Sequence, residues 1–165
     1  MSLCLERKSI RKFTDETVPE AMIEALLKSA MQAPSARNQQ PWEFIVIKNR
    51  EILNKLSEVS GGAKPLASAS LGILTVMRSD VSAPHMRPQD MGAATQNILL
   101  EATNQGLGAV WIGVYPLEDR LKAVKTIVEM KHDLTPFCLI AIGYPDQDTT
   151  VTNYRYDASR VKVIE

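Results

Sequence analysis

Residues 137–144, FCLIAIGY, form a short and almost wholly apolar run. Three further runs of the same kind are EFIVIK at 43–48, LGILTVM at 71–77 and AVWIGV at 109–114. The apolar residues are continuous rather than alternating, which is typical of strands that are covered on both faces. The four runs therefore predict a buried central sheet.

The first predicted helix precedes residue 34. Its apolar residues are spaced at i, i+3, i+4, i+7 and i+8, namely Ile23, Leu26, Leu27, Ala30 and Met31. Thr17 and Glu20 have the spacing of a capping box and Pro19 suits a first turn, so we expect the helix to begin there. It should end near Ala33, because Pro34 disfavours helical geometry in the residue before it.

Further helical patterns lie between the apolar runs. One has Asp90 as a candidate N-cap and Gly106 as a stop, with a stripe of Met91, Ala94, Thr95, Ile98, Leu99 and Ala102. Another, from about Pro116 to Ile127, has a stripe of Leu117, Leu121, Val124 and Ile127, and a shorter one uses Ile52, Leu53 and Leu56. Since helices and strands are interspersed, we expect helices on both sides of the sheet.

Composition limits the class of protein. The 165 residues are 45% hydrophobic, which suits one domain over 1–165. A net charge of zero argues against nucleic-acid or membrane-surface binding, and no run approaches the ~20 apolar residues of a membrane span. The two cysteines make no disulfide framework, and His85 and His132 lack the spacing of metal ligands. We expect a cytoplasmic protein without a metal site.

Residues 6–13, ERKSIRKF, place four basic side chains around Ser9: Arg7, Lys8, Arg11 and Lys12. If this segment is helical, Arg7 and Arg11 share one face, since they are four residues apart. Planar guanidinium groups and a hydroxyl together suit a phosphate. The alternative is a solvated, positively charged helix face.

Residues 33–42, APSARNQQPW, contain prolines that stiffen the backbone and amides that can donate and accept. Ser35, Asn38 and Gln40 could hydrogen-bond a planar heterocycle. The alternative is a buried corner anchored by Trp42. No motif supplies a catalytic acid, base or nucleophile, and Cys138 is interpreted as a small buried hydrophobe. A site of this composition suits a bound organic cofactor that carries the reaction.

Five segments occur in one order: RKSIRKF (7–13), APSARNQQPW (33–42), QDMGAATQNILLEATNQGLGAVWIG (89–113), IGYP (142–145) and RYDASRVKV (155–163). In these segments the chain resembles the FMN-dependent nitroreductase family. The resemblance implies an α+β fold with a central, mainly antiparallel sheet flanked by helices. It also implies an intertwined homodimer with FMN at the subunit interface, and residues 154–165 are expected to form a tail that reaches the partner subunit.

The resemblance assigns roles residue by residue. Arg7, Lys8 and Ser9 match positions that bind the FMN phosphate and ribityl chain, Arg155 a later phosphate-binding position, and Arg11 the basic residue near flavin N1 and O2. The segment contributed by the other subunit is matched by Pro34, Ser35, Ala36 and Asn38. The backbone that passes the reactive centre of the flavin is matched by Trp111, Ile112 and Gly113. Val114 and Asn153 depart from the family pattern, where a second glycine and a basic residue are frequent.

The resemblance implies an oxidoreductase that uses NADH or NADPH to reduce nitroaromatics or quinones through flavin N5, with no catalytic side chain. One alternative is a non-enzymatic FMN-binding or sensing module. Another is a relative on the same scaffold that cleaves carbon–halogen bonds or fragments the flavin. The sequence leaves open the physiological acceptor, the choice of nicotinamide and the roles of three polar residues in the loop-like stretches 60–65 and 78–89: Lys64, His85 and Arg87.

Overall fold

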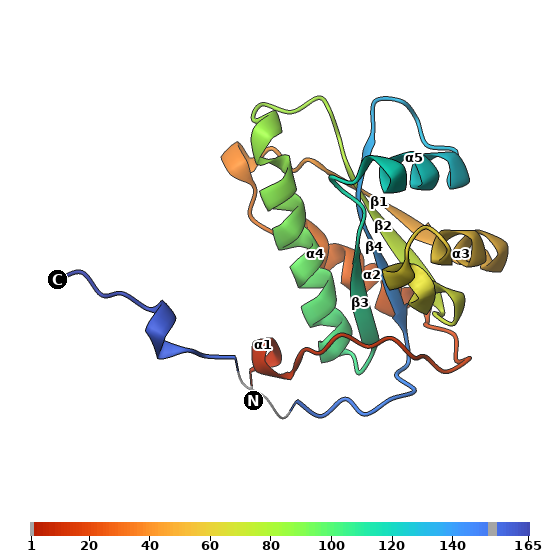
Figure 1. The fold of residues 1–165 in the computed structure, drawn as a ribbon, viewed down its shortest axis with the longest axis horizontal. Coiled ribbons are helices and arrows are strands. Elements are labelled where there is room, and N and C mark those ends of the chain that lie inside the picture. The colour runs from red at the N-terminus through yellow and green to blue at the C-terminus, as the bar shows by residue number, and fades with distance from the viewer. Residues whose placement is uncertain (1, 152–154) are drawn as a thin grey trace.

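The computed structural model describes residues 2–151 and 155–165. Its centre is a four-stranded antiparallel sheet with the order β1-β2-β4-β3 (Figure 1). The strands are β1 (Trp42–Ile47), β2 (Leu71–Met77), β3 (Gly108–Gly113) and β4 (Thr135–Gly143). All four apolar runs are therefore strands. β2 and β4 are the inner pair, which explains why their sequences are the most continuously apolar.

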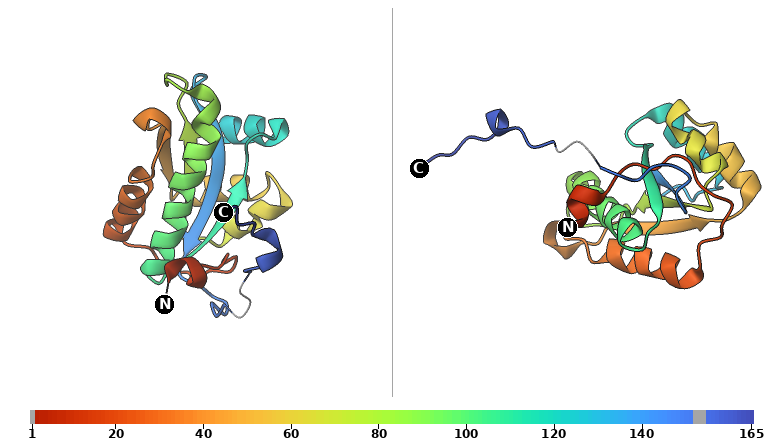
Figure 2. Two further views of the ribbon diagram at one scale, coloured as in Figure 1. Left: turned by 90° about the vertical axis from the view of Figure 1, so that its left-hand side faces the viewer. Right: turned by 90° about the horizontal axis from the view of Figure 1, so that it is seen from below.

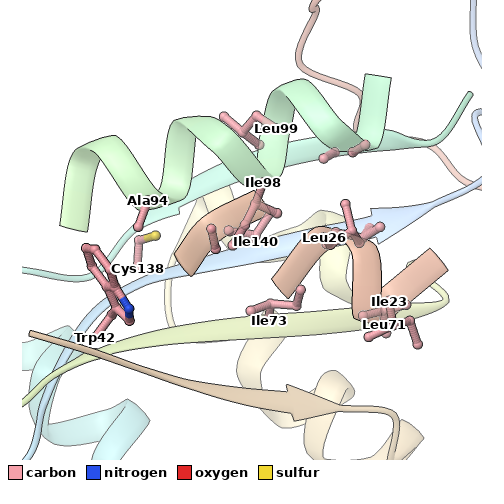
Figure 3. Packing of buried hydrophobic residues seen from close by; sticks show 14 of the residues in the cluster. Ile23, Leu26, Trp42, Leu71, Ile73, Ala94, Ile98, Leu99, Cys138 and Ile140 are labelled. Carbon is pink, nitrogen blue, oxygen red and sulfur yellow. The ribbon is translucent and has the colours of Figure 1, made fainter. Parts of the chain in front are cut away.

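Helices cover both faces of the sheet, as the interspersed pattern predicts (Figures 1 and 2). One face packs against α2 (Glu20–Met31) and α4 (Arg87–Asn104), and the other against α3 (Arg50–Ser57), η2 (Gly61–Ala67) and α5 (Glu118–Ile127). Successive residues of a strand point to opposite faces, so Ile73 and Ile140 face α2 and α4 (Figure 3), while Leu74 and Leu139 pack in the other cluster.

Two threonines surround the buried thiol of Cys138 in the first of these clusters. Thr75 Oγ1 lies 3.2 Å from Cys138 Sγ, and Thr95 Oγ1 lies 3.5 Å from it. Burial raises the pKa of Cys138 to about 11, so the group is a neutral thiol. The interpretation of Cys138 as a small buried hydrophobe is confirmed, because the side chain is fully buried beside Ala94 (Figure 3).

Two predicted N-terminal caps are wrong, and one predicted helix start lies two residues too early. Pro19 is the N-cap of α2 and no side chain caps the helix, so the Thr17–Glu20 capping box does not form. α5 begins at Glu118 rather than near Pro116 and leaves Leu117 exposed. Asp90 is not an N-cap, because α4 already begins at Arg87. The predicted end of α4 is correct, since Gly106 follows it with a φ of +74°, a conformation that glycine adopts without strain.

The N-terminal basic segment is not a helix. α1 covers only Leu3–Glu6, and Arg7 ends it with an extended backbone. From there the chain runs along the end of the sheet, where Ser9 forms an isolated parallel bridge with Ala109 and Phe13 an antiparallel one with Pro145. Arg7 and Arg11 therefore come together through an extended segment rather than through one helical face.

The described part of the C-terminal tail, residues 155–165, extends away from the rest of the chain (Figures 1 and 2). It contains one short turn, η4 (Ala158–Arg160), and its apolar side chains Tyr156, Val161, Val163 and Ile164 are exposed. Asn153 and the first residue of the expected tail, 154, lie outside the described residues.

Replacing Gly108 by Ala tests how tightly the N-terminal segment is seated on β3. The new Cβ would lie 2.5 Å from Ile10 Cγ2 and 2.7 Å from Ile10 Cβ, so Ile10 must move. We expect Gly108→Ala to lower the free energy of unfolding by about 1–3 kcal/mol, the usual cost of overpacking, in urea titrations.

Gly61→Ala is the matched control, because a Cβ there meets no atom within 4 Å. We expect it to change the stability by less than about 1 kcal/mol. Equal effects of the two substitutions would contradict the tight packing of Ile10 on Gly108.

Candidate functional site

A cationic pocket of about 560 Å³ lies where α1, the following extended segment and the chain after β4 meet. Five of the residues assigned from the sequence line it: Arg7, Lys8, Ser9, Arg11 and Arg155. The other lining residues carry no carboxylate: Cys4, Leu5, Gln147, Thr150 and Val151. The structure thus brings together four positive charges from segments more than 140 residues apart, which is the composition of an anion site.

The guanidinium groups of this pocket are available for a ligand. Within the residues that the structure describes, those of Arg7, Arg11 and Arg155 make no hydrogen bond and no ion pair. Arginine stays protonated at any ordinary pH and presents planar donors that match phosphate oxygens. The pocket can therefore hold a phosphate monoester.

Lys8 has a different position from the arginines. Its ammonium Nζ donates to the backbone carbonyls of Asp148 and Thr150, each at 3.0 Å. The Thr150 N–H in turn donates to Asp148 Oδ1, and this hydrogen bond lowers the pKa of that carboxyl below its usual value. Lys8 thus ties the chain after β4 to the basic segment and forms one wall of the pocket.

Gln147 is a pocket residue that the sequence reasoning missed. Its side-chain Oε1 accepts from the N–H groups of Arg11 and Lys12, at 2.8 and 3.1 Å. This contact fixes the backbone that carries the Arg11 side chain into the pocket. No local signal could have found it, because the partners are more than 130 positions apart in the sequence.

β3 is an edge strand. The N-terminal segment contacts one end of its outer edge, and α5 contacts the other end. The Ile10 N–H donates to the Ala109 carbonyl at 3.0 Å, and Arg120 Nη1 donates to the Gly113 carbonyl at 2.7 Å. Backbone groups alternate between the two edges of a strand, so the N–H and C=O of Trp111 face the same outer edge. Trp111, Ile112 and Gly113, assigned from the sequence to pass the reactive centre, thus include an accessible backbone donor and acceptor.

The segment 33–42 is a stiff corner at the other end of the molecule. Arg37, Asn38 and Gln40 all have left-handed φ values, of 54°, 54° and 46°. Ser35 Oγ accepts from the Gln40 N–H, and Asn38 Oδ1 accepts from Gln40 Nε2. The corner contains η1 (Ala36–Asn38) and is anchored in the core by Trp42, which is buried as expected.

Asp90 and Gln39 hold this corner against the first turn of α4. The buried Asp90 carboxylate accepts from the Ala36 N–H at 2.9 Å and from Gln39 Nε2 at 2.6 Å. Gln39 also exchanges two hydrogen bonds with the backbone of Ala83. The function of Gln39 in the fold was not predicted, because its partners come from the distant segment 83–90.

The assigned residues thus form two groups at opposite ends of α4. Figure 1 shows α1 beside one end of this helix and the segment of residues 36–38 beside the other. Asp90 contacts the corner, whereas Thr103 lines a pocket together with Lys8. At 1.5 Å per residue, Asp90 and Thr103 are about 20 Å apart along the helix. Pro34, Ser35, Ala36 and Asn38 therefore do not line the cationic pocket of their own chain.

The three polar loop residues left without a role fall in two places. Lys64, in η2, forms an ion pair with Glu58 at 2.6 Å. His85 and Arg87 line a small pocket beside the start of α4. No helix among the described residues is long and apolar enough to cross a membrane.

A four-stranded antiparallel sheet with helices on both faces and a cationic pocket beside its edge strand defines a domain of the α+β class. The model of the nitroreductase family matches residues 4–80 and 72–144. A protein of Methanothermobacter thermautotrophicus, provisionally named NADH dehydrogenase/NAD(P)H nitroreductase, is 41% identical over 156 residues, which are 94% of this chain and 81% of that protein. The chain belongs to the nitroreductase family.

Solved structures agree with this assignment. A provisionally named NADH oxidase of Clostridium acetobutylicum is 43% identical, with a TM-score of 0.95 over 98% of both chains. An FMN-dependent nitroreductase of Clostridium difficile is 28% identical, with a TM-score of 0.89 over 98% of this chain and 96% of that one. A Desulfovibrio desulfuricans protein, also 28% identical and solved in complex with FMN, has a TM-score of 0.83 over 96% and 92%.

A more distant relative has another activity in its name. The iodotyrosine deiodinase of Thermotoga neapolitana is 26% identical over an alignment of 168 positions that covers 87% of each protein.

Replacing Gln39 by Ala tests the attachment of the corner to α4. The substitution leaves the buried Asp90 Oδ2 and the Ala83 N–H without their partner, so we expect a loss of about 1–3 kcal/mol in the free energy of unfolding. Gln32→Ala, an exposed position just after α2, should change stability by less than about 0.5 kcal/mol. Urea titration measures both, and a neutral Gln39→Ala would contradict the role of this amide.

Proposed function

We propose that the protein is an FMN-dependent oxidoreductase that uses NADH or NADPH to reduce electron-poor acceptors. The observation that carries this proposal is the cationic pocket at the end of a nitroreductase sheet, beside the accessible edge of β3. Bound FMN would supply the redox chemistry, as a hydride acceptor at N5 and a two-electron donor to the acceptor. For a nitroaromatic the overall reaction would be ArNO₂ + NADH + H⁺ → ArNO + NAD⁺ + H₂O.

The residues present fit the chemistry of FMN. A phosphate monoester needs cationic donors without competing carboxylates, and the pocket has three unpaired arginines and no acidic lining residue among those described. Ser9 adds a hydroxyl beside the start of β3. In this proposal Arg7, Ser9 and Arg155 hold the phosphate and ribityl chain, while Lys8 holds the wall of the pocket.

Arg11 and the outer edge of β3 supply the electrostatics for the ring system. A fixed guanidinium near N1 and O2 stabilises the negative charge that two-electron reduction places there. The backbone N–H and C=O of Trp111 offer a donor and an acceptor that do not change protonation state. The protein therefore orients the cofactor and needs no side chain as acid or base.

A homodimer completes the site in this proposal. Ser35 and Asn38 belong to the corner at the Asp90 end of α4, about 20 Å along the helix from Thr103, and do not line the cationic pocket of their own chain, so a second chain would bring them to it. The left-handed turn at Asn38 is held by defined hydrogen bonds, which suits a contact surface. The tail of residues 154–165, whose described part leaves its own domain, would extend over the partner.

The relative named for deiodination is the specific observation behind a second candidate function, reductive cleavage of a carbon–halogen bond. A non-enzymatic FMN-binding or sensing module is the third. The sensing module would bind FMN without oxidising NADH or NADPH faster than free FMN does, and reduction of iodotyrosine in preference to nitrobenzene would favour the second candidate. We favour reduction of nitroaromatics or quinones, because the more similar relatives are named for NAD(P)H nitroreductase activity.

Loss of Arg7 or Arg11, two of the three unpaired arginines, should weaken FMN binding. We expect Arg7→Gln and Arg11→Gln each to raise the Kd for FMN about ten- to a hundredfold, since each removes a charge-assisted hydrogen bond. Quenching of flavin fluorescence measures the Kd, and purified wild-type protein should be yellow.

Lys12→Gln is the matched control for this experiment. Lys12 lies in the same segment and is exposed, but it does not line the pocket. The Kd of Lys12→Gln for FMN should stay within about threefold of the wild-type value. Colourless protein that takes up no added FMN would overturn the proposed function. Yellow protein that NADH and NADPH fail to bleach without oxygen would favour the sensing module.

Replacing Asn38 by Gly tests the contribution of the corner. Glycine accepts the left-handed φ of 54° without strain, so the substitution removes the amide and keeps the backbone. We expect the FMN Kd to rise about three- to tenfold, the value of one neutral hydrogen bond. Arg37→Gly, at the same φ, is the control and should leave the Kd unchanged. Light scattering should give twice the 18.3 kDa chain mass for the wild type, Asn38→Gly and Arg37→Gly.

A mixed dimer shows which chain supplies Asn38. If each site takes Arg11 from one chain and Asn38 from the other, a dimer of Arg11→Gln and Asn38→Gly chains has one intact site and one that lacks both residues. Half of the FMN should then bind with wild-type affinity. If both residues of a site came from one chain, no site of the mixed dimer would be intact.

A further inference from the structure

A small pocket of about 260 Å³ lies at the far end of β3 from the cationic pocket. Ser9 pairs with Ala109 at the start of the strand, whereas Tyr115 follows its last residue, Gly113, by two positions. The pocket is lined by the end of β2, the short turn η3 (Pro84–Met86), the start of α4 and the segment after β3, through Met77, Pro84, His85, Arg87, Pro88 and Tyr115.

Arg87 is fixed in this small pocket. Its Nε donates to the Pro84 carbonyl at 3.0 Å, and its Nη1 donates to the Arg78 carbonyl at 2.8 Å. The other terminal nitrogen, Nη2, has no partner among the described residues. A half-buried guanidinium held by two backbone carbonyls keeps its charge in one place and its remaining donors available.

No carboxylate among the described residues forms an ion pair with Arg87. Asp80 is bound by Arg78 through two hydrogen bonds, of 3.0 and 2.6 Å, and Asp90 is bound by Ala36 and Gln39. The lining contains two basic side chains and no acidic one. The small pocket therefore favours a negatively charged group.

The remaining lining is apolar and flat. The Tyr115 ring lies 6.4 Å from the Phe137 ring at an angle of 30°, and Phe137 in turn meets Trp111 at 5.7 Å, edge to face. The rings of Tyr115, Phe137 and Trp111 thus form a row that leads from the small pocket to β3. The buried thioether of Met77 and the two prolines complete walls that suit one aromatic ring.

We propose that the small pocket binds the electron acceptor and that the preferred acceptors are single-ring aromatic anions, such as nitrobenzoates. Arg87 receives the carboxylate, and Tyr115 packs against the ring. This inference rests on the proposed function and deepens it, because it names the substrate class. It gives Arg87 the role of a specificity-determining residue.

Binding of ligands that cannot be reduced tests the small pocket directly. We expect calorimetric titration of the FMN-loaded protein to show benzoate binding about tenfold or more tightly than the uncharged benzamide, because only benzoate gains a charge-assisted hydrogen bond. Arg87→Gln should abolish this difference. Lys28→Gln, which removes one positive charge from an exposed ion pair with Glu24 outside the small pocket, should keep it.

Turnover gives the second readout. With NADH or NADPH as reductant, the wild-type kcat/KM for 4-nitrobenzoate should exceed that for 4-nitrobenzamide by about tenfold. Arg87→Gln should lower kcat/KM for 4-nitrobenzoate to the value for 4-nitrobenzamide and leave the latter unchanged. Equal binding of benzoate and benzamide by the wild type, or equal losses in Arg87→Gln and Lys28→Gln, would overturn the inference. If Arg87→Gln fails to fold, Arg87→Met replaces it, and a folded Arg87→Met protein that keeps the full preference would overturn the inference.

The two proposals fail in different ways. Protein that reduces 4-nitrobenzamide but does not prefer the anion overturns the acceptor class and leaves the proposed function intact. Protein that binds benzoate through Arg87 but takes up no FMN overturns the proposed function and leaves the small pocket as an anion site.

Discussion

The pairing of β4 with β2 on one side and β3 on the other is the constraint on which the rest of the structure depends. It buries both faces of the inner strands, so helices must cover the sheet on both sides. It also leaves β3 at an edge. The outer edge of β3 is then shared between the N-terminal segment at one end and Arg120 at the other, with Trp111 between them. The candidate site is this edge together with the basic residues beside its start.

A break in the same pairing shapes the other end of β3. The register between β2 and β4 shifts at Thr75 and Val76, so Phe137 has no opposite residue. Its carbonyl accepts from the N–H groups of Val114 and Tyr115, and its ring lies between those of Trp111 and Tyr115. A β-bulge redirects side chains in this way. The bulge thus places the aromatic wall of the small pocket, and Val114, which departs from the family pattern, is a buried core residue there.

The length of α4 separates the corner from the cationic pocket. One end contacts the corner through Asp90, and the other adjoins the segment of Lys8, about 20 Å away along the helix. The hydrogen bonds of Gln39 and Asp90 stiffen the corner, so its polar groups keep one arrangement. Of the two interpretations of residues 33–42, the structure confirms the corner, and the corner is also what would make its polar groups a defined surface for a partner.

The sequence by itself determined the four strands, the helices between them and the buried anchors Trp42 and Cys138, because burial of apolar runs and helical periodicity are local properties. It also determined which residues carry the charge of the cationic pocket. Only the tertiary structure decided that Arg7 and Arg11 come together along an extended segment, that Gln147 holds that segment, and that Asp90 binds the corner instead of capping α4. These contacts join residues separated by 50 to 140 positions, and their geometry depends on the folded sheet rather than on any local pattern.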